Sequence, residues 1–125
     1  MSKEPFNRNK LIAEFMGMSP NPAGTYAVEG VPYHKGNYYL DGMAYDSSWD
    51  WLMSVVKKIE EIPIEDDNLT IKSHRFIIET PLTRCEIYDT VSNQLIGSGD
   101  HGSKILSTHN AVVEFIKWYN KNYKS

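Results

Sequence analysis

The chain has 125 residues, of which 41% are apolar and 23% charged, and this composition is typical of one globular domain with its own core. No apolar run approaches the roughly 18 residues of a membrane span, and the polar start lacks a secretory signal core, so we expect a cytoplasmic protein with no membrane partner. The net charge of −3 disfavours long nucleic acid as a partner, since that affinity comes mainly from Lys and Arg meeting phosphates.

The N-terminal third predicts a short helix followed by a long loop. Asn7 or Asn9 can cap the helix, Leu11 to Met16 supply its apolar face, and Gly17 suits its C-terminal end. Residues 18–45 are rich in Gly, Pro, Asn and Tyr and show no helical period. Within this tyrosine-rich loop the pattern favours a short hairpin that pairs residues 25–28 with 38–40, with Gly36 and Asn37 in the turn.

The best-signalled helix is predicted over Tyr45–Ile62. Ser47 and Asp50 have the spacing of a capping pair, and Pro63 ends the element because it lacks an amide donor. Apolar residues recur at helical spacing along one face, which we expect to pack in the core. This predicted stripe consists of Trp49, Leu52, Met53, Val56 and Ile59.

The C-terminal half predicts three strands and a long helix. Strands are expected at residues 76–78, 84–88 and 94–97, and the run of Phe and Ile in the first favours cover on both of its sides. Their short connections indicate an antiparallel meander. A long amphipathic helix starts at Ser103 or slightly later. The fold class is therefore α+β: one domain with an antiparallel sheet of three or slightly more strands, two long helices and one short N-terminal helix.

Several of these segments resemble a known family. They are IAEFMG at Ile12–Gly17, the Tyr-x-x-x-Trp helix start at Tyr45–Trp49, VVKKIE at Val55–Glu60 and AVVEFIKWYN at Ala111–Asn120. Together with the two middle strands they resemble the small phage-encoded proteins of the phage ABA sandwich domain family. The resemblance implies a phage or prophage origin and helices packed on an antiparallel sheet. It implies no catalytic residues, and counter-defence through sequestration of a nucleotide signal is a function that proteins of this source and size serve.

A glycine-rich segment before the last helix is a candidate anion site. Gly97 to Lys104 reads GSGDHGSK, and converging backbone N–H groups at a helix start favour phosphate. The final Ser-Lys order reverses that of a nucleotide-binding loop, so a plain strand-to-helix connection is the alternative. Cys85 is the one cysteine of the chain, so an internal disulfide is excluded, and we expect an inert buried thiol. The histidines, among them His101 and His109, are scattered and lack the spacing of metal ligands.

The tyrosines of residues 18–45 are the other candidate binding feature, because their rings stack on bases, although some can simply cover the core. The leading hypothesis is a non-enzymatic protein, without cofactor or metal, that captures a small anionic nucleotide-like ligand between this loop and the glycine-rich segment. The expected ligand-binding residues are Tyr33, Tyr38, Tyr39, Tyr45, Gly99, His101, Ser103 and Lys104. The alternatives are a protein-interaction module that blocks a host factor and a nucleotide hydrolase using Asp100 and His101, and self-association stays open for each.

Overall fold

The computed structural model describes residues 7–31, 34–62, 76–80, 83–90 and 92–123. These residues form three α-helices, α1 (Arg8–Phe15), α2 (Trp49–Glu60) and α3 (Lys104–Tyr123), and one short 3-10 helix, η1 (Leu40–Gly42). They also form the strands β1 (Tyr26–Val31), β2 (His34–Tyr38), β3 (Phe76–Glu79), β4 (Arg84–Asp89) and β5 (Gln94–Asp100).

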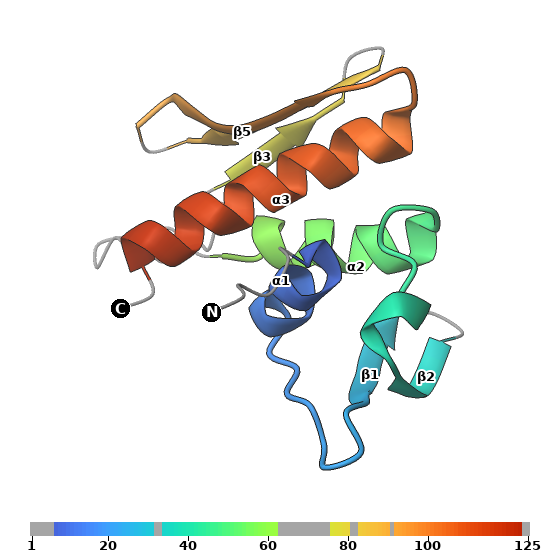
Figure 1. The fold of residues 1–125 in the computed structure, drawn as a ribbon. Coiled ribbons are helices and arrows are strands. Elements are labelled where there is room, and N and C mark those ends of the chain that lie inside the picture. Colours follow the sequence, from blue (N-terminus) through green and yellow to red (C-terminus); the bar gives the residue numbers. More distant parts are fainter. Residues whose placement is uncertain (1–6, 32–33, 63–75, 81–82, 91, 124–125) are drawn as a thin grey trace, which may run out of the picture.

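The predicted α+β class is confirmed, with a two-stranded sheet added to the expected three-stranded one. Strands β3, β4 and β5 pair antiparallel in that order, and β1 pairs antiparallel with β2. Helix α3 packs across β4 and β5, α2 lies beside α3 and β3, and α1 packs on α3. Figure 1 shows the helices on one side of the three-stranded sheet and the β1–β2 hairpin beyond α2. None of the described helices is long and apolar enough to cross a bilayer.

The centre of the core is the contact between α3 and the sheet. Phe115 is fully buried, and its ring lies 4.7 Å from that of Phe76 on β3 and 6.2 Å from that of Phe15 in α1. Both contacts are edge-to-face, the arrangement that places the positive edge of one ring on the negative face of the other. Three elements are thus joined through one side chain.

Two glycines of β5 allow this close approach. A Cβ atom on Gly97 would lie 2.7 Å from the carbonyl oxygen of Ala111, and one on Gly99 would lie 2.8 Å from the amide nitrogen of Ala111. Both are shorter than any real Cβ contact, so only glycine fits. Two of the three glycines that suggested a phosphate loop are thus inside a strand, where they pack against the backbone of α3.

The other face of the sheet is open to water. Ile77 on β3 is 44% exposed and Leu95 on β5 is 49% exposed, and each pairs with Tyr88 on the central strand. The prediction that residues 76–78 are covered on both sides is therefore wrong. All described helices lie on one face, so the opposite side chains of each strand remain in solvent (Figure 1).

Helix α2 begins later than predicted, and its buried face is rotated. It starts at Trp49 with Ser48 as its N-cap residue, and no side-chain cap hydrogen bond forms, so the predicted Ser47 cap is wrong. The buried residues are Trp51, Leu52, Val55, Val56 and Ile59. Trp49 and Met53, both predicted in the core, are 43% and 49% exposed. More than half of the circumference of the helix is apolar, so the spacing of its apolar residues is compatible with either choice of buried face.

The predicted N-terminal helix forms, and the predicted hairpin forms with a shifted second strand. Asn7 caps α1 by accepting a hydrogen bond from the amide of Lys10 at 3.0 Å, and Gly17 has the left-handed φ of +85° that ends the helix. Gly36 and Asn37 lie within β2, so the predicted turn there is wrong. The predicted second strand at residues 38–40 is wrong as well, because β2 ends at Tyr38 and residue 40 begins η1. The side-chain amide of Asn9 donates to the carbonyls of residues 40 and 43, which fixes η1 to α1.

Candidate functional site

The tyrosines predicted to bind a ligand have different environments. Tyr33 lies outside the described residues. Tyr38 is half-buried, with its ring edge-on to that of Trp51 at 5.1 Å, whereas Tyr39 is 60% exposed. Of these two described tyrosines, Tyr39 therefore presents most of its surface to solvent, whereas Tyr38 does so in part.

Tyr45 belongs to the core. Its side chain is 0% exposed, its ring lies 5.2 Å from that of Trp51, and burial raises its pKa to about 12. The hydroxyl has no hydrogen-bond partner among the described residues. Tyr45 is one of the predicted ligand-binding residues, but in this structure its side chain offers no surface to a ligand.

His109 is a second buried polar group near this region. It is 5% exposed, its Nε2 atom has no hydrogen-bond partner in the described part of the chain, and burial lowers its pKa. The carboxylate of Asp46 opposes that shift and the guanidinium of Arg8 adds to it. His109 is thus a neutral core histidine at neutral pH, as expected for the inner face of the last helix.

The four other predicted residues surround the start of α3. Gly99 packs on the helix, and the Ser103 hydroxyl accepts a hydrogen bond from the amide of Leu106 at 3.4 Å, which is a weak helix cap. The side chains of His101 and Lys104 are exposed. Within this segment, Gly99 therefore has a packing role and the Ser103 hydroxyl a capping role.

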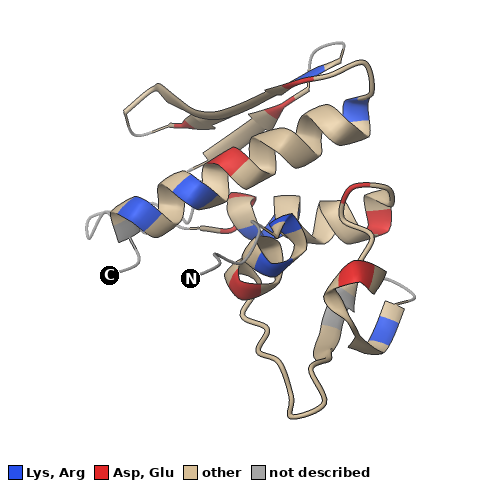
Figure 2. Ribbon diagram, in the orientation of Figure 1, with Lys and Arg blue, Asp and Glu red and all other residues tan. Residues whose placement is uncertain are grey.

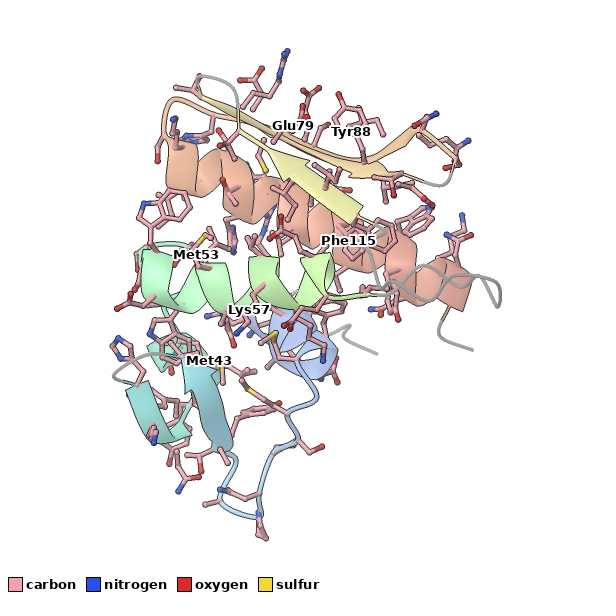
Figure 3. The ribbon with its side chains drawn as sticks, turned by 180° about the vertical axis from the view of Figure 1, so that it is seen from behind. Met43, Met53, Lys57, Glu79, Tyr88 and Phe115 are labelled. Carbon is pink, nitrogen blue, oxygen red and sulfur yellow. The ribbon has the colours of Figure 1, made fainter. Side chains whose placement is uncertain are left out.

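The structure does not bring these two groups together. Figures 1 and 3 show, from opposite sides, α2 between the β1–β2 hairpin and the β5–α3 turn. Tyr38 ends β2 and Tyr39 comes directly after it, on the hairpin side of α2. The other side has the β5–α3 turn, which contains His101 and Ser103 and leads into Lys104. In this structure α2 separates the two described sets.

A groove that the sequence did not indicate lies between α2 and the edge of the sheet. It encloses about 200 Å³. Its lining residues are Trp49, Met53, Val56 and Glu60 on α2, Ile78 and Thr80 at the end of β3, and Thr108 on α3. Figure 3 shows Met53 in the space between α2 and the sheet. The helix residues are spaced by four, three and four, so one side of α2 forms a continuous wall.

The described walls of the groove are largely apolar. Trp49 and Met53 are two of the most exposed large apolar side chains of the described chain. Glu60 is the charged member of the lining, and no Lys, Arg or His is among the described lining residues. Figure 2 shows acidic residues on the strands of the sheet and basic residues near both ends of α3. Apolar groups suit this groove better than phosphates do.

The described residues contain no group of three or more His, Cys, Asp or Glu side chains placed to hold a metal ion. Cys85 is buried, and burial raises the pKa of its thiol to about 11, so it stays protonated at neutral pH. Asp100 and His101, the residues of the hydrolase alternative, are both exposed. No protein-family model, curated protein or solved structure matches this chain. The likeness to phage sandwich proteins therefore stays a prediction.

Proposed function

We propose that this protein is a non-enzymatic interaction module that binds a partner protein through the groove between α2 and β3. One observation carries the proposal: two large apolar side chains, Trp49 and Met53, stand nearly half exposed on the same wall of a groove. Exposing such groups costs about 25 cal/mol per Å² of apolar surface, which a partner's apolar side chain removes on binding. Side chains of this kind are the usual anchors of protein interfaces.

The groove is favoured over the nucleotide site because of its charge and composition. A nucleotide-like anion needs cations or converging N–H groups, whereas the charged residue of the groove lining is Glu60. The cationic Lys104 is the first residue of α3, whereas the exposed Tyr39 lies between β2 and η1. Capture of a nucleotide signal remains the competing hypothesis, and the same experiment tests it.

The predicted phage origin directs the choice of partner. If the chain is a phage product, the proteins it meets are those of a bacterial host, and blocking one of them is the form of counter-defence that an interaction module supplies. This step rests on the resemblance in sequence and on no feature of the groove itself.

A pull-down from bacterial lysate with matched variants tests the proposal. Met53→Asp places a carboxylate in the groove, and Leu95→Asp places one at an equally exposed apolar position on β5, away from the groove. We expect a partner, identified by mass spectrometry, that the wild type and Leu95→Asp retain and Met53→Asp loses. Circular dichroism of both variants controls for folding.

Thermal-shift measurements on the same proteins address the competing hypothesis. Cyclic dinucleotides and common nucleotides are added at concentrations well above micromolar, where a specific ligand raises the melting temperature by mass action. We expect no shift. Two results together would contradict the groove as the functional site. A nucleotide would raise the melting temperature of the wild type and of Met53→Asp equally, and Met53→Asp would lose no partner from the lysate.

A further inference from the structure

The outer face of the three-stranded sheet is the face that none of the described helices covers. Side chains alternate along β4, so that Cys85 and Ile87 are buried whereas Glu86 and Tyr88 lie on the outer face. Figure 3 shows Tyr88, and Glu79 of β3, on the side of the sheet that faces away from the helices. Two rows of outward side chains, one apolar and one acidic, cross the strands here.

The apolar row spans all three strands. Tyr88 on the central strand lies opposite Ile77 on β3 and opposite Leu95 on β5. The side chains of Ile77 and Leu95 are both nearly half exposed. Covering such a row is favourable in proportion to the apolar area that is removed from water. The row therefore favours a further layer packed on this face.

The acidic row lies next to the apolar row along the strands. Glu79 and Glu86 are direct cross-strand partners, and like charges in that position destabilise a sheet. Arg84 lies 3.9 Å from Glu86 and offsets part of that charge. Partial desolvation and the nearby carboxylates of Glu86 and Glu79 raise the pKa of Tyr88, so the negative field extends to the apolar row. A cation supplied by a partner would be stabilised between the two carboxylates.

The charge of the outer face decides between possible occupants. Its described charged side chains are the acidic Glu79, Glu86 and Asp100 and the basic Arg84. Nucleic acids and anionic lipids carry phosphates, which an acidic face repels. Two copies of this chain packed face to face would each bring the same negative charge. A basic segment of a partner protein is the occupant that the charge favours.

The spacing of the two rows matches one turn of an α-helix. Tyr88 and Glu86 are two residues apart in a strand, which is about 6.7 Å along the strand. In an α-helix, residues four apart lie on one side and are about 6 Å apart along the axis. A helix laid along the strands therefore places an apolar side chain over Tyr88 and a basic side chain, one turn further on, next to Glu86.

We propose that the outer face of β3, β4 and β5 binds an amphipathic helix of a partner protein that carries apolar residues and, one turn away, basic residues. The apolar side chains cover the row centred on Tyr88, and the basic ones lie between Glu79 and Glu86. This surface is separate from the groove, so the inference goes beyond the proposed function and does not depend on it. A lysate partner bound here would be lost by Leu95→Asp and retained by Met53→Asp, the reverse of the pattern expected for the groove.

A synthetic helix tests this surface. The probe is a sixteen-residue peptide of alanine and glutamine with blocked ends, with leucine at its fifth and eighth positions and lysine at its ninth and twelfth, which share one face of the helix. It is titrated into the isotope-labelled full chain, whose backbone amide NMR shifts report both the affinity and the place of binding. We expect the largest shifts in β3, β4 and β5.

Two control peptides separate charge from helical structure. The first has glutamate in place of both lysines, which tests attraction to the acidic row. The second has proline at the seventh position, on the opposite face of the helix, which breaks the helix and retains the leucines and lysines. We expect each control to bind at least about fivefold more weakly than the probe.

Three protein variants assign the contacts. Glu79→Lys should weaken probe binding about fivefold, and it should also raise the melting temperature, because it converts a like-charge cross-strand pair with Glu86 into an opposite-charge pair. Ile77→Gln should weaken probe binding about fivefold by removing apolar surface. Asp41→Lys makes the same change of charge on η1 and should bind within about twofold of the wild type. All three positions are exposed, so the variants are expected to fold.

Each result supports or overturns the inference. Shifts in β3, β4 and β5 that Glu79→Lys and Ile77→Gln weaken support it. Shifts confined to α2 around Met53 mean that the peptide occupies the groove, and they overturn it, as does equal binding of either control peptide. Absence of shifts at about millimolar probe also overturns it. A dimer in sedimentation that Ile77→Gln dissociates would make a second copy of this chain the occupant instead.

Discussion

Replacing Gly99 by alanine tests why the segment before α3 is rich in glycine. The added Cβ would lie 2.8 Å from the amide nitrogen of Ala111 and 2.9 Å from the Cβ of Asn110, and closer still to the carbonyl oxygen of Ser107. Two of these three atoms belong to the backbone of a 20-residue helix, which cannot yield one atom at a time. The whole of α3 must move away from β5.

The cost follows from the packing that this movement disturbs. Overpacking a close-packed core by one methyl typically costs about 1–3 kcal/mol, and more where backbone atoms are displaced. For a domain of this size each kcal/mol lowers the melting temperature by about 4 °C. We expect Gly99→Ala to lower the free energy of unfolding by at least about 2 kcal/mol in urea titrations.

Gly102→Ala is the matched control, because a Cβ there would have no heavy atom within 4 Å. Its unfolding free energy should lie within about 0.5 kcal/mol of the wild type. If Gly99→Ala were as mild as Gly102→Ala, the close approach of β5 and α3 would be refuted. The spacing of these glycines would then be explained better by a phosphate-loop role.

The remaining predictions concern the helix α2 face and the buried polar groups. Trp51→Ala should cost about 3–5 kcal/mol in urea unfolding and Trp49→Ala less than about 1 kcal/mol, and the reverse order would contradict the observed face. Burial lowers the pKa of His109 below 6.5, so the unfolded chain binds the proton first and the free energy of unfolding should fall as the pH drops below 6.5. In His109→Gln the free energy of unfolding should depend less on pH between 7 and 5. The same pH dependence in the variant and the wild type would refute this. Tyr45→Phe removes an unpaired buried hydroxyl and should leave the melting temperature unchanged or higher; a clear decrease would mean that the hydroxyl is hydrogen-bonded in solution.

Much of the fold could be predicted from local signals. The Asn7 cap, the left-handed Gly17 and the three strands joined by short connections each depend on residues close in sequence, and those predictions are confirmed. The rotation of α2 could not be predicted in this way. Trp49 and Trp51 both belong to the first turn of α2. Which of them is buried depends on the β1–β2 hairpin, whose His34 and Tyr38 contact Trp51.

The candidate site was harder to predict because it is made by contacts between distant segments. Glycines before a helix favour an anion site and equally favour close packing, and only the position of α3 decides between these explanations at Gly99. The groove joins α2 to Ile78 and Thr108, which are far apart in the chain. The sequence of α2 by itself does carry a signal for the groove. Trp49, Met53 and Glu60 lie on one side of the helix, where its apolar face is wider than packing in the core requires.

The two edges of the three-stranded sheet have different consequences for assembly in crowded solution. Strand β5 carries an extra residue, since Ile87 pairs with Gly97 while the next residue, Tyr88, pairs with Leu95. Such a bulge twists an edge and interrupts its ladder, whereas β3 pairs in an unbroken register. A molecule with two regular edges can polymerise into a fibril. Within the described residues, the bulged strand β5 is therefore the edge that is protected from such pairing.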